Sequence, residues 1–246
     1  MRKDIIYGIR PVMEAVEAGR EIDRVFMRNG LRGPLAQSLL NLLRQNEVPF
    51  QFVPEVKLNR ISRINHQGVI AMISAITWQD TAQIIPGIYE SGETPLILVL
   101  DGITDVRNFG AVARTAECAG AHALVVASRG SAMTGPDAVK TSAGALHTIP
   151  VCRTQSLPET VKFLKDSGLK IVAASEKADL LYHEADLRGP AALIMGSEEK
   201  GISPAVIEQA DIRVKIPVFG SIGSLNVSAA ASVLVYEMIR QRSSQV

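Results

Sequence analysis

Five polar residues fall in loops or at helix starts where they could do chemistry: Asn108, Arg114, Glu198, Ser224 and Asn226. Asn108 can cap a helix, and Arg114 on that helix lies about 200° around from the apolar positions two residues away, at ~3.6 residues per turn. A guanidinium that points away from the core, near a helix start that favours anions, suits a phosphate group. The plainer alternatives are that Arg114 is a solvated surface residue and that Asn108 is only a cap.

Two glycine-bearing loops carry the other polar residues. "IMGSEEKGISP" (194–204) places Gly196 at the end of an apolar run, where a missing side chain lets another group approach the backbone closely. "IPVFGSIGSLNVSAA" (216–230) begins as a loop of small residues and ends in an apolar helix. Either Ser224 or Asn226 caps that helix and the glycines only make the turn, or the loop holds a ligand.

Familiar catalytic motifs are absent from the sequence. No G-x-G-x-x-G follows the first expected strand of the large sheet, and no P-loop or G-x-S-x-G elbow is present, which argues against a dehydrogenase, a P-loop nucleotide-binding protein and a serine hydrolase. The two cysteines and four histidines show no metal-ligand spacing, so we expect neither a metal site nor a disulfide framework. They are Cys118, Cys152, His66, His122, His147 and His183.

The composition describes an ordinary globular chain of 246 residues, 47% hydrophobic and 4% aromatic, with a formal charge of +1. Residues 1–78 carry 11 Lys/Arg against 7 Asp/Glu, and the remainder carries 15 against 18. This modest basic bias at the N-terminal end is compatible with RNA contact and with an ordinary solvated surface. No apolar run reaches the ~20 residues of a membrane span and no signal peptide is evident, so we expect a cytoplasmic protein.

The second half of the chain alternates short apolar runs with helical segments. Such runs are typical of parallel strands buried on both faces, with helices covering each side of the sheet. In sheets of this kind ligands bind beyond the carboxyl ends of the strands, where the loops above lie. The expected strands are 96–100, 123–127, 170–175, 191–196 and 212–218, and the expected helices are 110–119, 137–146, 158–167, 203–209 and 227–238.

The first part of the chain predicts a separate small αβ domain. We place this domain at residues 1–77, a linker at 78–94, and the large α/β domain at 95–246. Pro86, Gly87 and Gly92 interrupt the helical pattern of the linker, although its isoleucines indicate that part of it packs.

Three motifs in this order resemble the SpoU/TrmH family of RNA 2′-O-ribose methyltransferases, in the SPOUT class. They are "NFGAVAR" (108–114), "MGSEEKGI" (195–202) and "IPVFGSIGSLNVSAA" (216–230). "YGIRPVMEAV" and "HQGVIAMI" near the N-terminus are similar to that family's RNA substrate-binding domain, a ribosomal-protein-like αβ sandwich. The resemblance is strongest to the branch that methylates a guanosine of 23S ribosomal RNA.

The resemblance implies S-adenosylmethionine as cofactor, held in a pocket made by a deep trefoil knot. The knot would involve the chain from about Gly196 to the C-terminal helix. Carried over residue by residue, Gly196, Ile216 and Leu225 bind the cofactor, largely through backbone groups. The resemblance also implies a homodimer with the knot region at its interface, in which Arg114 can act near the partner's pocket.

The matching catalytic positions are Asn108, Arg114, Glu198, Ser224 and Asn226. Arginine is a poor base because its guanidinium stays charged at ordinary pH, so we expect Arg114 to pair with RNA phosphate and stabilise the developing alkoxide. The two asparagines would orient Arg114 and the ribose, Ser224 would contact substrate or phosphate, and Glu198 would position its neighbours.

Two other functions fit the same motifs. One is a methyltransferase of this family that acts on transfer RNA, although such enzymes usually lack the N-terminal domain and carry basic extensions. The other is an RNA-binding protein that keeps the fold without catalysis, which the full set of five polar residues argues against.

Overall fold

The computed structural model describes residues 4–243, which form two compact units. The first holds the chain up to Thr77 together with Met133–Pro136, and the second holds Trp78–Ala132 and the chain from Asp137 onward. Within residues 4–243 no helix is both long and apolar enough to cross a membrane.

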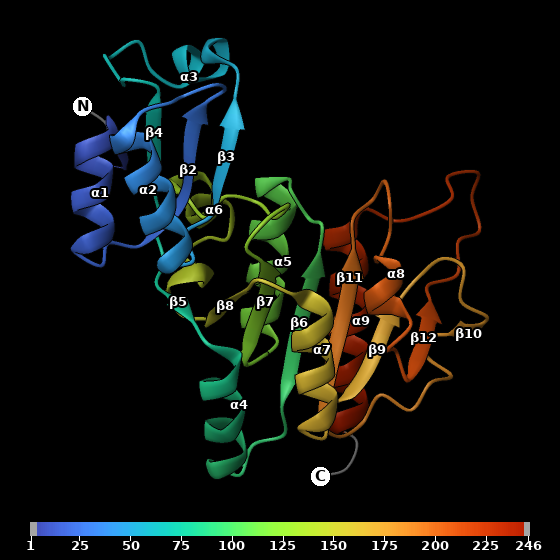
Figure 1. Ribbon diagram of the computed structural model, residues 1–246. Helices are drawn as coiled ribbons and strands as arrows, with labels where there is room; N and C mark the ends of the chain where they lie inside the picture. Colours follow the sequence, from blue (N-terminus) through green and yellow to red (C-terminus); the bar gives the residue numbers. More distant parts are fainter. Residues whose placement is uncertain (1–3, 244–246) are drawn as a thin grey trace. The chain divides into compact units, whose positions relative to one another are not determined.

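The first unit is built on a four-stranded sheet with helices on both faces (Figure 1). In spatial order its strands are β1 (Ile5–Tyr7), β4 (Val69–Ile73), β2 (Ile22–Arg28) and β3 (Phe50–Val53), and β4 runs in the direction opposite to the other three. Helices α1 (Ile9–Glu17) and α2 (Pro34–Gln45) bury apolar stripes on one face, while α3 (Glu55–Ile61) covers the other face. The alternation of buried residues along β2 therefore serves two small cores.

The second unit is an eight-stranded sheet in which every pairing is parallel, so the expected α/β class with a small αβ domain before it is confirmed. Its spatial order is β10-β12-β9-β11-β6-β7-β8-β5, and β6 and β11 lie at the centre. The strands are β5 (Trp78–Gln79), β6 (Leu96–Asp101), β7 (Ala123–Ala127), β8 (Val151–Thr154), β9 (Lys170–Ala174), β10 (Leu180–Leu181), β11 (Ala191–Gly196) and β12 (Ile212–Lys215).

Helices cover both faces of this sheet. One face is packed by α4 (Thr81–Glu90), α7 (Leu157–Asp166) and α8 (Pro204–Ile207). On the other side α5 (Val106–Cys118) and α9 (Val227–Ser243) pack against each other, and a hydrogen bond joins the Thr115 and Ser232 hydroxyls at 3.0 Å. This pairing matters because α5 and α9 each begin beside the carboxyl edge of the central strands (Figure 1).

Several elements differ from the sequence expectation. Residues 78–94, expected as a linker, form β5 and α4 and belong to the second unit. Helix α4 tolerates Pro86 inside it because Ile85 and Ile88 are buried in the core. The expected helix 137–146 is split into α6 (Pro136–Thr141) and a 3₁₀ turn at Ala145–His147, and β8 was not expected at all.

A short piece of the loop after β7 belongs to the first unit. Met133 packs against the apolar cluster beneath α3, and the Thr134 hydroxyl donates to Asp23 at 3.1 Å. The Thr134 and Ser74 hydroxyls lie 3.0 Å apart, and all three side chains are buried. The chain therefore passes between the two units three times, at 77/78, 132/133 and 136/137.

The partly buried guanidinium of Arg242 links the end of α9 to the amino edge of the large sheet. It donates to the carbonyls of Thr94 (3.1 Å), Pro95 (2.9 Å) and Gly189 (2.6 Å), and burial lowers its pKa. We expect Arg242→Met to lower the free energy of unfolding by about 3 kcal/mol, because three carbonyls lose a charged donor.

Chemical denaturation of the full chain measures this effect. Arg188→Met is the control, since Arg188 and its partner Asp186 are both exposed. Equal stability of the two variants would contradict the bracing role of Arg242.

Candidate active site

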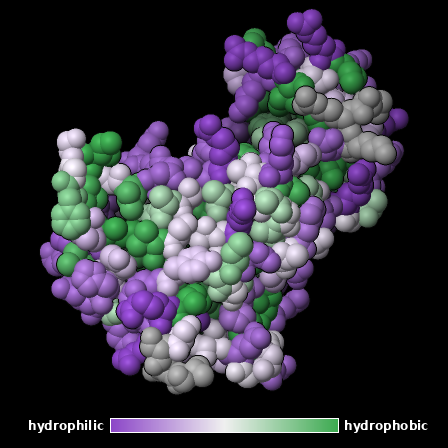
Figure 2. Space-filling view, turned by 180° about the vertical axis from the view of Figure 1, so that it is seen from behind, coloured by the Kyte–Doolittle hydropathy of each residue, from purple (hydrophilic) through white to green (hydrophobic). Residues whose placement is uncertain are grey.

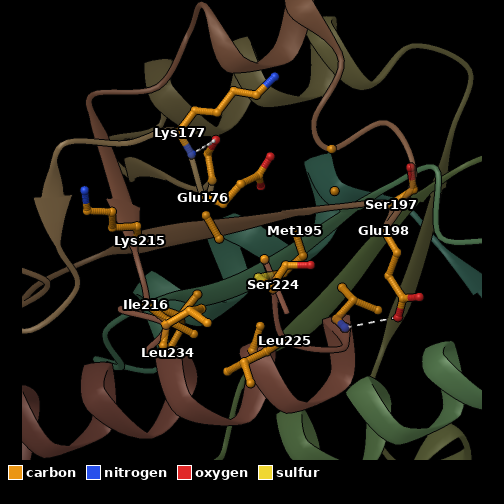
Figure 3. Close-up of a pocket in the computed structure, with 18 of the residues that line it drawn as sticks. Glu176, Lys177, Met195, Ser197, Glu198, Lys215, Ile216, Ser224, Leu225 and Leu234 are labelled. Atoms are coloured by element: carbon orange, nitrogen blue, oxygen red, sulfur yellow. Dashed lines mark hydrogen bonds between the residues drawn. The ribbon is translucent and has the colours of Figure 1, made fainter. Parts of the chain in front are cut away.

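A cavity of about 390 Å³ opens at the carboxyl ends of β9, β11 and β12 (Figure 3). Its size falls within the usual range for small-molecule and cofactor sites. Apolar side chains of Ile216, Leu225 and Leu234 gather on one side of it, and Glu176 and Lys177 lie on the other. The cavity thus offers both an apolar surface and charged groups to a ligand.

Gly196 ends β11 at the wall of this cavity, and its lack of a side chain is a packing requirement of the fold. A Cβ atom here would overlap the backbone of Gly201 and Ile202. The turn folds back because Ser197 and Gly201 exchange two backbone hydrogen bonds of 3.2 and 2.8 Å. Gly196 therefore shapes the loop that lines the cavity. The sequence predicts that another group approaches its backbone closely, but not that this group is the backbone of Gly201 and Ile202.

The carboxylate of Glu198 joins three segments of the chain. Its Oε1 atom accepts hydrogen bonds from Nδ2 of Asn108 (3.2 Å), Nδ2 of Asn226 (2.5 Å) and the backbone N–H of Val227 (3.3 Å). The last of these bonds satisfies a free donor at the start of α9 (Figure 3). One carboxylate oxygen thus fixes the start of α5, the loop after β11 and the start of α9.

Asn226 completes this junction with its amide group. Its Nδ2 also donates to Oδ1 of Asn108 at 3.0 Å, while its own Oδ1 accepts from the backbone N–H and the hydroxyl of Ser228. Asn226 is therefore a helix cap, as the plainer alternative held, and also a link to α5. Asn108 is not the cap of α5. Asp105 caps that helix by accepting hydrogen bonds from the backbone N–H groups of Asn108 and Arg107, and these bonds lower the pKa of the Asp105 carboxyl group.

The loop between β12 and α9 closes one side of the cavity. Ile216, Ser224 and Leu225 line it, as do Gly196 and Glu198 from the loop after β11. The same loop exposes large apolar side chains, with Phe219 96% and Ile222 76% exposed. Figure 2 shows hydrophobic groups at the edge of this unit where the loop projects.

Asn108 and Asn226 do not line this cavity, but both donate to Glu198, which does. Arg114 is placed apart from the cavity and from this junction. It lies on α5, six residues after Asn108, with an exposed side chain. It makes no ion pair with any residue in 4–243, and it does not line the cavity of its own chain. Hydrogen bonds bring Asn108, Glu198 and Asn226 together, and Ser224 lines the cavity. The Arg114 side chain is exposed on the surface of α5.

The loop after β9 was missed by the sequence analysis. Ser175, Glu176 and Lys177 line the cavity, and the backbone N–H of Lys177 donates to the Ser175 hydroxyl at 3.3 Å. The signal was available, because a strand was expected at 170–175 and ligands bind beyond the carboxyl ends of parallel strands.

Within residues 4–243 no group of three or more His, Cys, Asp or Glu side chains is placed to hold an ion. Of the cysteines, Cys152 lies in β8 with its side chain buried in the core, and burial raises the pKa of its thiol to about 11.

Comparison with known proteins identifies relatives over nearly the whole chain. Residues 95–236 match the SpoU rRNA Methylase family, and residues 5–79 match the family described as RNA 2′-O ribose methyltransferase substrate binding. A protein of Bacillus subtilis (strain 168), YacO, named as a TrmH family tRNA/rRNA methyltransferase, is 32% identical over 98% of this chain and 96% of its own.

Solved structures agree with this assignment. A crystal structure of an RNA 2′-O ribose methyltransferase is 32% identical, with a TM-score of 0.56, over 96% of this chain and 88% of the other. The SpoU methyltransferase AviRb from Streptomyces viridochromogenes, solved in complex with AdoMet, is 28% identical, with a TM-score of 0.62, over 98% and 90%. The two matched families together cover residues 5–236 except 80–94, and the chain belongs to the SpoU rRNA methylase family.

Proposed function

We propose that this protein transfers a methyl group from S-adenosylmethionine to a ribose 2′-hydroxyl of RNA, and that its substrate is a guanosine of 23S ribosomal RNA. The observation that carries the proposal is the cavity beside the junction of Asn108, Glu198 and Asn226. A family member solved with AdoMet has the same fold.

The residues of the cavity fit this cofactor. Ile216, Leu225 and Leu234 offer apolar surface to the adenosine, and Glu176 and Lys177 offer charges to its polar ends. Gly196 keeps the loop after β11 folded back, so that backbone groups line the cavity. When bound, the cofactor supplies an electrophilic methyl carbon on a sulfonium.

Transfer of this methyl group to the ribose oxygen would leave the thioether S-adenosylhomocysteine, and the hydroxyl proton would pass to water. Ser224, at the cavity, contacts the substrate. Asn108 and Asn226 are held in fixed orientations by their hydrogen bonds to Glu198. Alignment of this kind lowers a barrier by roughly 7–11 kcal/mol, so a strong base is not required.

Arg114 stabilises the developing alkoxide and pairs with the adjacent phosphate of RNA. Since Arg114 does not line the cavity of its own chain, it serves the cavity of a second copy in a homodimer. The exposed apolar loop 218–225 supports such a dimer, because a monomer seldom exposes Phe and Ile side chains to this extent. A deep trefoil knot around residues 196–243 is part of this proposal.

The test of substrate is direct. Full-length protein with tritiated S-adenosylmethionine is incubated with 23S ribosomal RNA transcripts and with total transfer RNA, followed by mapping of 2′-O-methyl groups. We expect transfer to one guanosine of the 23S transcript and none to transfer RNA. Methylation of transfer RNA alone would overturn the ribosomal assignment, and single-turnover assays without transfer to either RNA would point to a binding protein.

A further inference from the structure

The loops at one end of the N-terminal sheet carry most of that unit's positive charge. The carboxyl ends of β1, β2 and β3 and the amino end of β4 share this end, because β4 alone runs antiparallel. Backbone hydrogen bonds join the loops there, from Gly8 N to Val69 O, Arg28 N to Gly68 O and Asn29 N to Val53 O. We call the segments 8–10, 28–33 and 54–68 the basic end.

The basic end is strongly asymmetric in charge. It holds six basic residues and one acidic residue, whereas the rest of residues 4–77 holds three basic and six acidic residues. A net charge of +5 in three adjoining loops produces a local positive potential that suits a polyanion. The basic residues are Arg10, Arg28, Arg32, Lys57, Arg60 and Arg63, and the acidic one is Glu55.

Most of these charges are available to a ligand. Arg28 pairs with Glu55 at 3.4 Å, and Lys57 lies 5.2 Å from the Phe26 ring centre. The other four arginines of the basic end are exposed and form no ion pair with any residue in 4–243. Unpaired guanidinium groups bind phosphate oxygens readily, often through two parallel hydrogen bonds.

An aromatic ring accompanies the charges. Phe52, near the end of β3, is 44% exposed and packs edge-on against Phe50 with ring centres 6.0 Å apart. Val56 and Ile64 in the following loops are 62% and 47% exposed. Exposed aromatic rings beside basic residues are typical of surfaces on which unpaired bases stack.

We infer that the basic end docks the RNA substrate, with the four exposed arginines on the phosphate backbone and Phe52 against an unpaired base. The inference rests on the proposed function and specifies which face of the first unit takes the RNA. Unpaired RNA fits this surface better than an acidic protein, because an aromatic platform adds nothing to recognition of carboxylates.

The first test removes two charges and compares matched variants of the full chain. R32Q/R63Q removes two arginines of the basic end, and R20Q/R44Q removes two exposed arginines elsewhere in the same unit. We expect R32Q/R63Q to weaken binding of 23S ribosomal RNA fragments on the order of tenfold and to reduce the slope of log K against log salt by about 1.4. KM for RNA should rise while kcat stays unchanged.

Equal affinities for R32Q/R63Q and R20Q/R44Q would overturn the docking surface. Failure of the wild type to methylate any RNA would instead overturn the proposed function, so the two failures are distinguishable. Calorimetry with S-adenosylmethionine should show the same affinity in both double variants, which excludes general misfolding.

The second test concerns the ring. Phe52→Ala should weaken binding of an unpaired RNA on the order of tenfold, whereas Phe52→Tyr, which keeps the ring, should bind like the wild type. The two variants should have equal affinities for a fully paired RNA. An equal loss in Phe52→Ala and Phe52→Tyr, or no loss in either, would contradict base stacking at this position.

Discussion

Arg114→Ala should lose at least about 100-fold in the rate of methyl transfer while it keeps the cofactor affinity of the wild type. The size of the effect is that of one preorganised donor which stabilises charge in a transition state. Cofactor affinity should be unchanged because Arg114 lies on the exposed side of α5 and does not line the cavity. Single-turnover transfer of tritiated methyl groups measures the rate, and calorimetry measures the affinity.

Arg107→Ala is the control for Arg114, since Arg107 is an exposed arginine of the same helix that pairs with Asp105. A comparable loss in both variants would mean that α5 contributes only general positive charge. Because Arg114 is assigned to the cavity of a second copy, mixing Arg114→Ala protein with a Ser224→Ala variant offers a further check. Mixed dimers should recover part of the activity, and no recovery would contradict the shared site.

Gly196→Val should abolish detectable binding of S-adenosylmethionine. The added side chain would overlap the backbone of Gly201 and Ile202, so the turn after β11 must move and the wall of the cavity moves with it. Calorimetry gives the affinity, and thermal unfolding shows whether the rest of the domain stays folded. The mechanism is a displaced loop, whereas the motif alone had suggested a clash with the cofactor itself.

Gly223→Ala is the matched control in the same cavity. Gly223 also lines it, yet a Cβ atom at Gly223 meets nothing within 4 Å. We expect this variant to bind the cofactor within about threefold of the wild type. Unchanged affinity in Gly196→Val, or equal loss in both glycine variants, would contradict the role given to the turn.

The sequence predicted the parallel sheet because its strands follow from local patterns. The site residues came from the three motifs that resemble a known family, and the roles given to them stay predictions. Apolar runs such as 96–100 and 191–196 are unambiguous strands, and the glycines and polar residues of the motifs fall at their ends. Helix α4 was missed because Pro86 outweighed its buried isoleucines, and β8 because four residues carry little signal. In each case burial by distant segments decided the structure.

Side-chain partnerships were the least predictable part of the site. Asn108, Glu198 and Asn226 are separated by 90 and 28 positions, and nothing local shows that one carboxylate oxygen serves them all. The separate position of Arg114 was equally unpredictable. Helical periodicity predicts on which face of the helix Arg114 lies, but not which other segments that face meets. These facts arise only when the sheet order places β11 beside β6.

The loop after β7 has a consequence for how this protein can be divided. An excised N-terminal piece ending at Thr77 would lack the methionine that packs beneath α3 and the threonine hydroxyl that donates to Asp23. The excised remainder would carry residues 133–136 without the partners that their apolar and hydroxyl side chains contact in the first unit. The two units are therefore not independent modules. Replacing the N-terminal unit with that of a relative would require residues 133–136 to be replaced as well.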